Sequence, residues 1–175
     1  MTKSLLPKVI SNLAKHEGRK ARMYPDTVGV VTVGVGHAIF NPQQALALPF
    51  SEVGYLNARP SAILADYAMV KNHLIKVGNL ILSEAAQDAV LAEDLKVTEK
   101  RLLEALPAAL SFPETAQIAL FDLVFNCGEL TEQKWPHFLA AVRAGDWKGA
   151  AAHCNRPQVS VTRNEDTKEQ LLDAA

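Results

Sequence analysis

The chain has 175 residues, of which 49% are hydrophobic and 21% are charged, and this length can bury the core of one domain. Its 18 lysines and arginines stand against 19 acids, so no field of one sign attracts nucleic acid. Apolar runs are all shorter than the roughly 18 residues that a membrane span needs. We therefore expect a protein that binds no nucleic acid and inserts into no membrane.

The N-terminal segment lacks the pattern of a secretory signal. Pro7 and Lys8 interrupt its apolar run, and no small-residue cleavage site follows. We expect synthesis in the cytoplasm without a signal peptide. Cys127 and Cys154 do not make a disulfide framework, and we interpret them as two reduced thiols. The histidines and cysteines show no paired ligand spacing, so we expect no metal and no cofactor.

The first predicted element is a helix over residues 4–17, which Ser4 can cap. Glu17 continues an apolar stripe of three residues at helical spacing, namely Leu6, Ile10 and Leu13. Burial on that stripe and the negative end of the helix dipole both disfavour a charged carboxylate. Glu17 is therefore a candidate general acid.

Residues 18–37 predict a small β-rich lobe. The tripeptide Tyr24-Pro25-Asp26 is typical of a turn. The β-branched residues between 28 and 35 favour short antiparallel strands, in which Thr32 presents a hydroxyl. Gly36 allows a tight exit before His37, and we expect His37 to make a structural hydrogen bond.

The rest of the chain is predicted to be mostly helical. Residues 38–60 are irregular, apart from a short helix at 42–47. Ser83 is the expected cap of the longest helix, and Thr162 with Glu165 forms a candidate capping box for the last one. Later helices are predicted at 61–78, 84–106, 113–127, 135–144, 146–153 and 163–174. The stretch AQIALFDLVFN is apolar nearly all round, which indicates a central helix.

These patterns predict an α+β, mostly helical fold in a single domain over residues 1–175. Its β-rich or irregular lobe would comprise residues 18–60. Its helical lobe would comprise residues 1–17 with 61–175.

Two carboxylates and a strand hydroxyl suit the cleavage of a glycosidic bond. One carboxyl must be protonated to assist the leaving oxygen, while the other must stay ionised. Glu17 lies on an apolar stripe and Asp26 in a polar turn, so their environments differ in the required direction.

The pattern E-x8-D-x2-G-x2-T-x-G-x-G-H, from Glu17 to His37, resembles the signature of the phage-type lysozymes, glycoside hydrolase family 24. FNCGE at 125–129, AGDW at 144–147 and SVTRNEDTKEQLL near the C-terminus also resemble family segments. The resemblance implies a lysozyme-like fold with the active-site cleft between the two lobes. Residues 38–83 are longer than in compact phage enzymes, which resembles pesticin-like or secretion-effector lysozyme domains.

By this resemblance Glu17 is the general acid, Asp26 positions or activates a water, and Thr32 holds that water. Arg163 would lie near the catalytic Glu17. The implied substrate is the β-1,4 bond between N-acetylmuramic acid and N-acetylglucosamine in peptidoglycan. A delivery system or an immunity protein is the implied partner, and the enzyme would act on the cell wall, in the periplasm, as a monomer.

Several supporting residues keep two interpretations. Tyr24 and Phe125 are either sugar platforms or core aromatics. Asn126 either bonds a sugar acetamido group or caps its helix, and Arg163 either holds Glu17 or lies at the surface. Two alternative functions also remain, a lytic transglycosylase and a non-catalytic wall-binding module on the same scaffold.

Overall fold

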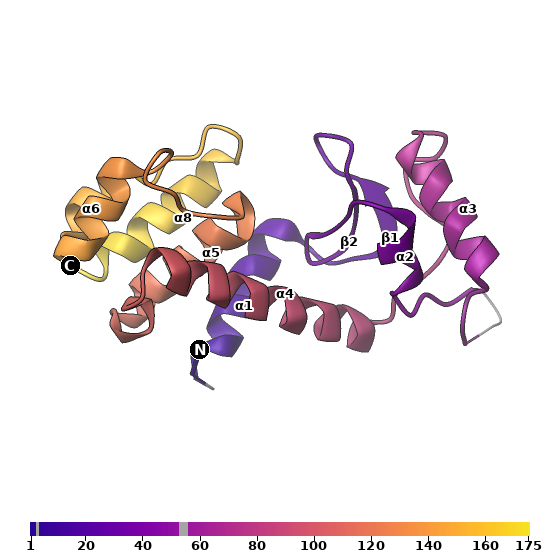
Figure 1. Cartoon of the computed structure of the whole chain (residues 1–175), viewed down its shortest axis with the longest axis horizontal. Coiled ribbons are helices and arrows are strands. Elements are labelled where there is room, and N and C mark those ends of the chain that lie inside the picture. The colour runs from indigo at the N-terminus through magenta and orange to yellow at the C-terminus, as the bar shows by residue number, and fades with distance from the viewer. Residues whose placement is uncertain (3, 53–55) are drawn as a thin grey trace. The chain divides into compact units, whose positions relative to one another are not determined.

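The computed structural model describes residues 1–2, 4–52 and 56–175 (Figure 1). Within these residues, 56% of the chain is helical, in eight α-helices, beside one three-stranded antiparallel sheet. This confirms the predicted α+β, mostly helical class. No helix in the described ranges is long and apolar enough to cross a membrane. The chain divides into two compact units, Glu17–Asp94 and Met1–His16 with Leu95–Ala175.

The sheet of the first unit is formed by β1 (Lys20–Pro25), β2 (Val31–Gly34) and β3 (His37–Ile39), in that order. Tyr24 on β1 lies opposite Thr32 on β2. The prediction that Tyr24 and Pro25 belong to a turn was wrong, because both are still in strand β1 and the turn begins at Asp26. The strands themselves were predicted.

Two helices lie wholly within this unit, α2 (Pro42–Leu46) and α3 (Pro60–Lys71). The short helix α2 confirms its prediction, and Asn41 caps it by accepting a hydrogen bond from the Gln44 amide. Helix α3 ends at Lys71 rather than at the predicted residue 78. The reason is His73, whose φ of +57° is incompatible with a continued right-handed helix.

The loop after α3 is tied back to the sheet. The Gly78 amide donates to the Met23 carbonyl at 2.7 Å, and the Leu82 amide donates to the Ala21 carbonyl at 2.7 Å. Buried Asp66 on α3 accepts from the amides that follow Gly78. One core therefore joins α3 and this loop to the strands, through Met23, Val31, Val33, Ile39, Ala45, Leu48, Phe50, Ile63, Tyr67, Val70, Leu80 and Leu82.

Helices α1 (Leu6–Glu17) and α4 (Glu84–Ala105) each contain a boundary between the units. The buried residues of α1 are Val9 and Leu13, preceded by buried Leu5, while the predicted stripe members Leu6 and Ile10 are only half-buried. The Ser4 hydroxyl pairs with that of Thr2. For α4 the predicted cap is confirmed, since the Ser83 hydroxyl accepts from the Ala86 amide.

The other unit is helical, with a 3₁₀ turn (Ala109–Ser111), α5 (Glu114–Cys127), α6 (Pro136–Ala144), α7 (Trp147–Ala152) and α8 (Val161–Leu172). Helix α5 is buried on most sides, as predicted. The predicted Thr162–Glu165 capping box was wrong. Ser160 is the N-cap of α8, because its hydroxyl accepts a hydrogen bond from the Arg163 amide.

Candidate active site

Glu17 is the last residue of α1, and its half-buried carboxyl lies against the turn between β2 and β3. A Cβ atom added at Gly36 would lie 3.1 Å from the Glu17 Oε2 and Cδ atoms. Gly36 also has a φ of +71°, which favours glycine. The Glu17 carboxyl can therefore occupy this position because Gly36 has no side chain.

Asp26 organises the turn that follows β1. Its Oδ1 atom accepts hydrogen bonds from the Val28 amide at 2.9 Å and the Val30 amide at 2.7 Å. Its own amide donates to the Val30 carbonyl at 2.8 Å. No residue in the described part of the chain donates a hydrogen bond to Oδ2. The carboxylate is thus held in a fixed orientation by one oxygen.

Thr32 is connected to Asp26 through Val30. Its hydroxyl donates to the Val30 carbonyl at 3.1 Å, and the Val30 amide donates to Asp26. Thr32 is 4% exposed, on the face of the sheet away from its core neighbours Val31 and Val33. Because its proton is given to a carbonyl, the Thr32 oxygen has lone pairs that can accept a further hydrogen bond.

Tyr24 lies within electrostatic reach of both carboxylates. Burial raises the pKa of the Tyr24 phenol, and the negative charges of Glu17 and then Asp26 raise it further. The Lys20 ammonium lies 3.7 Å from the centre of the Tyr24 ring. The phenol therefore stays protonated and can donate a hydrogen bond beside the two acids.

His37 on β3 forms a hydrogen bond with Asp94 on α4. Its Nδ1 atom lies 2.8 Å from Asp94 Oδ2, and the two side chains are 23% and 28% exposed. This is a structural hydrogen bond of the kind expected for His37. Asp94 was not predicted as this partner, because a carboxylate in a helix of mixed polarity carries no signal of the residue that it will bind.

Arg163 lies on α8 and is buried against Asp122 of α5. Its Nη2 atom is 2.7 Å from Asp122 Oδ1, and Arg156 Nη2 is 2.8 Å from Asp122 Oδ2. Burial raises the pKa of Asp122, but hydrogen bonds and charge from Arg163 and then Arg156 outweigh it and hold that pKa below its usual range. The Thr167 hydroxyl also lies 3.3 Å from Asp122 Oδ2.

The surface interpretation of Arg163 is therefore wrong, since the side chain is 5% exposed. Its predicted role of holding Glu17 stays a prediction. Asp122 and Arg156 were not predicted. The signal for Asp122 was its place as the only charged residue in an otherwise apolar helical stretch.

Phe125 and Asn126 are half-buried in the last turn of α5, and their roles toward a sugar stay predictions. Cys127 and Cys154 are both free thiols, and burial raises the pKa of each. They are therefore protonated at neutral pH. Throughout the described residues, no group of three or more His, Cys, Asp or Glu side chains could hold a metal ion.

Comparison with curated proteins gives no match for this chain. The family model described as Phage lysozyme matches residues 14–165. That span contains Glu17, Asp26, Thr32 and Arg163 together with the whole sheet. Members of this family are glycoside hydrolases that act on peptidoglycan. The chain therefore belongs to the phage lysozyme family.

Proposed function

We propose that this chain is a muramidase that hydrolyses the β-1,4 bond between N-acetylmuramic acid and N-acetylglucosamine with inversion at the anomeric carbon. Glu17 is the general acid that protonates the leaving oxygen. Asp26 is the general base that takes a proton from the attacking water. Thr32 orients that water.

The observation that carries this proposal is the Val30 link between Asp26 and Thr32. It leaves one acceptor on each residue, Oδ2 of Asp26 and the lone pairs of Thr32. Two acceptors can take both hydrogens of a single water, which turns an oxygen lone pair toward the sugar. An inverting mechanism needs such a water on the face of the sugar opposite the acid.

Glu17 is suited to donate a proton. It is the last residue of α1, and its half-buried carboxyl lies against the turn between β2 and β3. The close approach to Gly36 restrains its side chain. We further propose that Arg163 holds Glu17 and that Phe125, Asn126 and Tyr24 contact the sugar.

Two other functions use the same scaffold. A lytic transglycosylase needs the acid but no water-orienting pair, and the Asp26–Val30–Thr32 arrangement favours hydrolysis over it. A non-catalytic wall-binding module has no need of the acid, which this chain retains at Glu17.

One digestion separates the three functions. Purified protein is incubated with peptidoglycan sacculi, and the fragments are analysed by mass spectrometry. Reducing muramic acid ends are expected from hydrolysis. Ends with 1,6-anhydro rings would show transglycosylation, and intact sacculi that retain bound protein would show a binding module.

The place of action follows from the substrate. We propose that the enzyme reaches the cell wall through release or a delivery system, acts there as a monomer, and is neutralised in the producing cell by an immunity protein. The long segment between residues 38 and 83, with α2 and α3, supports a pesticin-like or secretion-effector subtype.

A further inference from the structure

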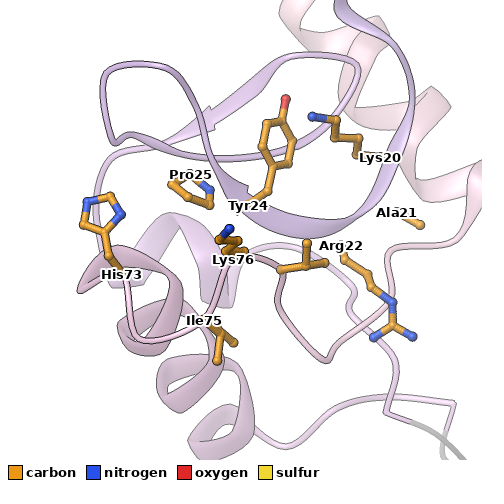
Figure 2. Close-up of a pocket in the computed structure, with 9 residues that line it drawn as sticks. Lys20, Ala21, Arg22, Tyr24, Pro25, His73, Ile75 and Lys76 are labelled. Carbon is orange, nitrogen blue, oxygen red and sulfur yellow. The ribbon is translucent and has the colours of Figure 1, made fainter.

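A cavity of about 740 Å³ lies between strand β1 and the loop that follows α3 (Figure 2). Its lining combines basic and apolar side chains: Lys20, Ala21, Arg22, Tyr24, Pro25, His73, Ile75, Lys76 and Val77. Within the described residues, none of its three lysine and arginine side chains is in an ion pair with a carboxylate. The cavity therefore suits a ligand that carries carboxylates and small apolar groups.

The walls of the cavity are fixed by the fold. The Arg22 guanidinium donates hydrogen bonds to the carbonyls of Gly78 and Asn79, so it fastens the loop to β1. The Gly78 amide adds its hydrogen bond to Met23 on the same strand. The Arg22 side chain is therefore occupied by hydrogen bonds within the fold. Lys76 is exposed, and Lys20 lies over the Tyr24 ring. These two lysines are the cations available to a ligand.

Two side chains of the lining also lie near the candidate active site. Tyr24 lines the cavity, and its phenol is influenced by both Glu17 and Asp26. The His73 Nε2 atom lies 3.4 Å from the position that a Cβ atom at Gly29 would take, in the Asp26 turn. The cavity is therefore adjacent to the carboxylates, on the same unit of the chain.

We propose that this cavity binds the peptide stem of peptidoglycan. Lys20 and Lys76 would pair with stem carboxylates, and the apolar wall of Pro25, Ile75 and Val77 would contact its alanine methyl groups. The stem is attached to the muramic acid beside the bond that the enzyme cleaves, so a sugar at Asp26 brings its stem to this cavity. The proposal rests on the proposed muramidase function.

Binding can be measured without any turnover. The free stem peptide, released from peptidoglycan by an amidase, is titrated into the protein while backbone amide signals are followed by NMR. Signals of Ala21, Arg22, Ile75 and Val77 are expected to shift. The same peptide with its carboxylates amidated is expected to bind about tenfold more weakly, because charged hydrogen bonds are lost. Equal binding of both peptides, or no binding, would overturn the proposal.

Cleavage of two substrates provides the second test. The double variant Lys20→Gln/Lys76→Gln is compared with wild type on stem-bearing glycan and on glycan stripped of its stems. Its kcat/KM is expected to fall about tenfold more on the stem-bearing substrate. Lys148→Gln, an exposed charge outside the cavity, is the matched control and should change neither value.

The outcomes keep the two proposals apart. If wild type cleaves neither substrate, the muramidase function fails. The NMR titration still tests whether the cavity binds the stem peptide, because it needs no turnover. If wild type cleaves both and the double variant loses activity equally on each, the stem proposal fails and the muramidase function stands.

Discussion

Glu17 is the residue on which the proposed chemistry depends most directly. Replacement by Gln keeps its size but removes the proton that a general acid supplies, and that contribution is roughly 10²–10⁴-fold. We expect Glu17→Gln to abolish peptidoglycan cleavage while its circular dichroism stays that of wild type. Retention of activity within about threefold would remove Glu17 from the mechanism.

Gly36 offers a second residue-scale test with a matched control. Gly36 and Gly145 both have φ near +70°, so an alanine at either should cost about 1 kcal/mol of folding free energy. Only at Gly36 does the new methyl group meet the Glu17 carboxyl, since nothing lies within 4 Å of a Cβ atom at Gly145.

We therefore expect Gly36→Ala to lose cleavage activity and Gly145→Ala to keep it at similar thermal stability. Thermal melts and sacculus digestion measure the two effects separately. Equal activity in both variants would mean that the position of Glu17 tolerates displacement.

At the scale of elements, the start of α8 distinguishes the observed cap from the predicted one. Ser160→Ala removes the hydroxyl that accepts from the Arg163 amide, and loss of an N-cap costs about 1 kcal/mol. Thr162→Ala removes no cap, so its unfolding free energy should match wild type in a urea titration. If Thr162→Ala lowered the unfolding free energy more than Ser160→Ala does, the Thr162–Glu165 capping box would be the correct assignment.

The elements also show what the sequence could reveal. Apolar periodicity predicted nearly every helix, because this signal is local. Of the caps, Ser83 was predicted correctly and the Thr162–Glu165 box was not. The end of α3 was missed, since nothing near His73 signals a positive φ. The Asp122 cluster was missed for a different reason. Its partners Arg156 and Arg163 lie more than 30 residues away in the chain and meet it only through packing.

The stability of the whole molecule should depend on pH through His16. Burial lowers the pKa of His16 below its usual value of 6.5. The negative charges of Asp122 and Asp166 act in the opposite direction, while the positive charges of Arg163 and Lys15 lower this pKa further. The unfolded chain therefore binds a proton more readily than the folded chain, so stability should fall as pH drops below about 6.5.

Replacing His16 with Asn should remove this part of the pH dependence. Urea titrations at about pH 7.5 and 5.5 would measure it as a smaller difference in unfolding free energy than in wild type. His153→Asn, at an exposed histidine of the same unit, should leave the difference unchanged. Identical behaviour of the two variants would contradict the role of His16.

Stereochemistry tests the assembled active site as a whole. A water directed by Asp26 and Thr32 inverts the anomeric carbon, whereas a nucleophilic Asp26 would retain its configuration. We expect the α-anomer of muramic acid to appear first from the β-linked strand, as observed by proton NMR during the earliest turnover. Initial release of the β-anomer would overturn the water mechanism.

The division of the chain at Glu17 and Leu95 has a consequence for its synthesis. Residues 17–94 are one continuous segment, whereas the other unit is formed from the first 16 residues and everything after Asp94. On a ribosome the strand-containing segment has all its partners once Asp94 has emerged. The first turns of α1 must wait for the helices after Asp94, so Leu5, Val9 and Leu13 stay without their core until those helices have been synthesised.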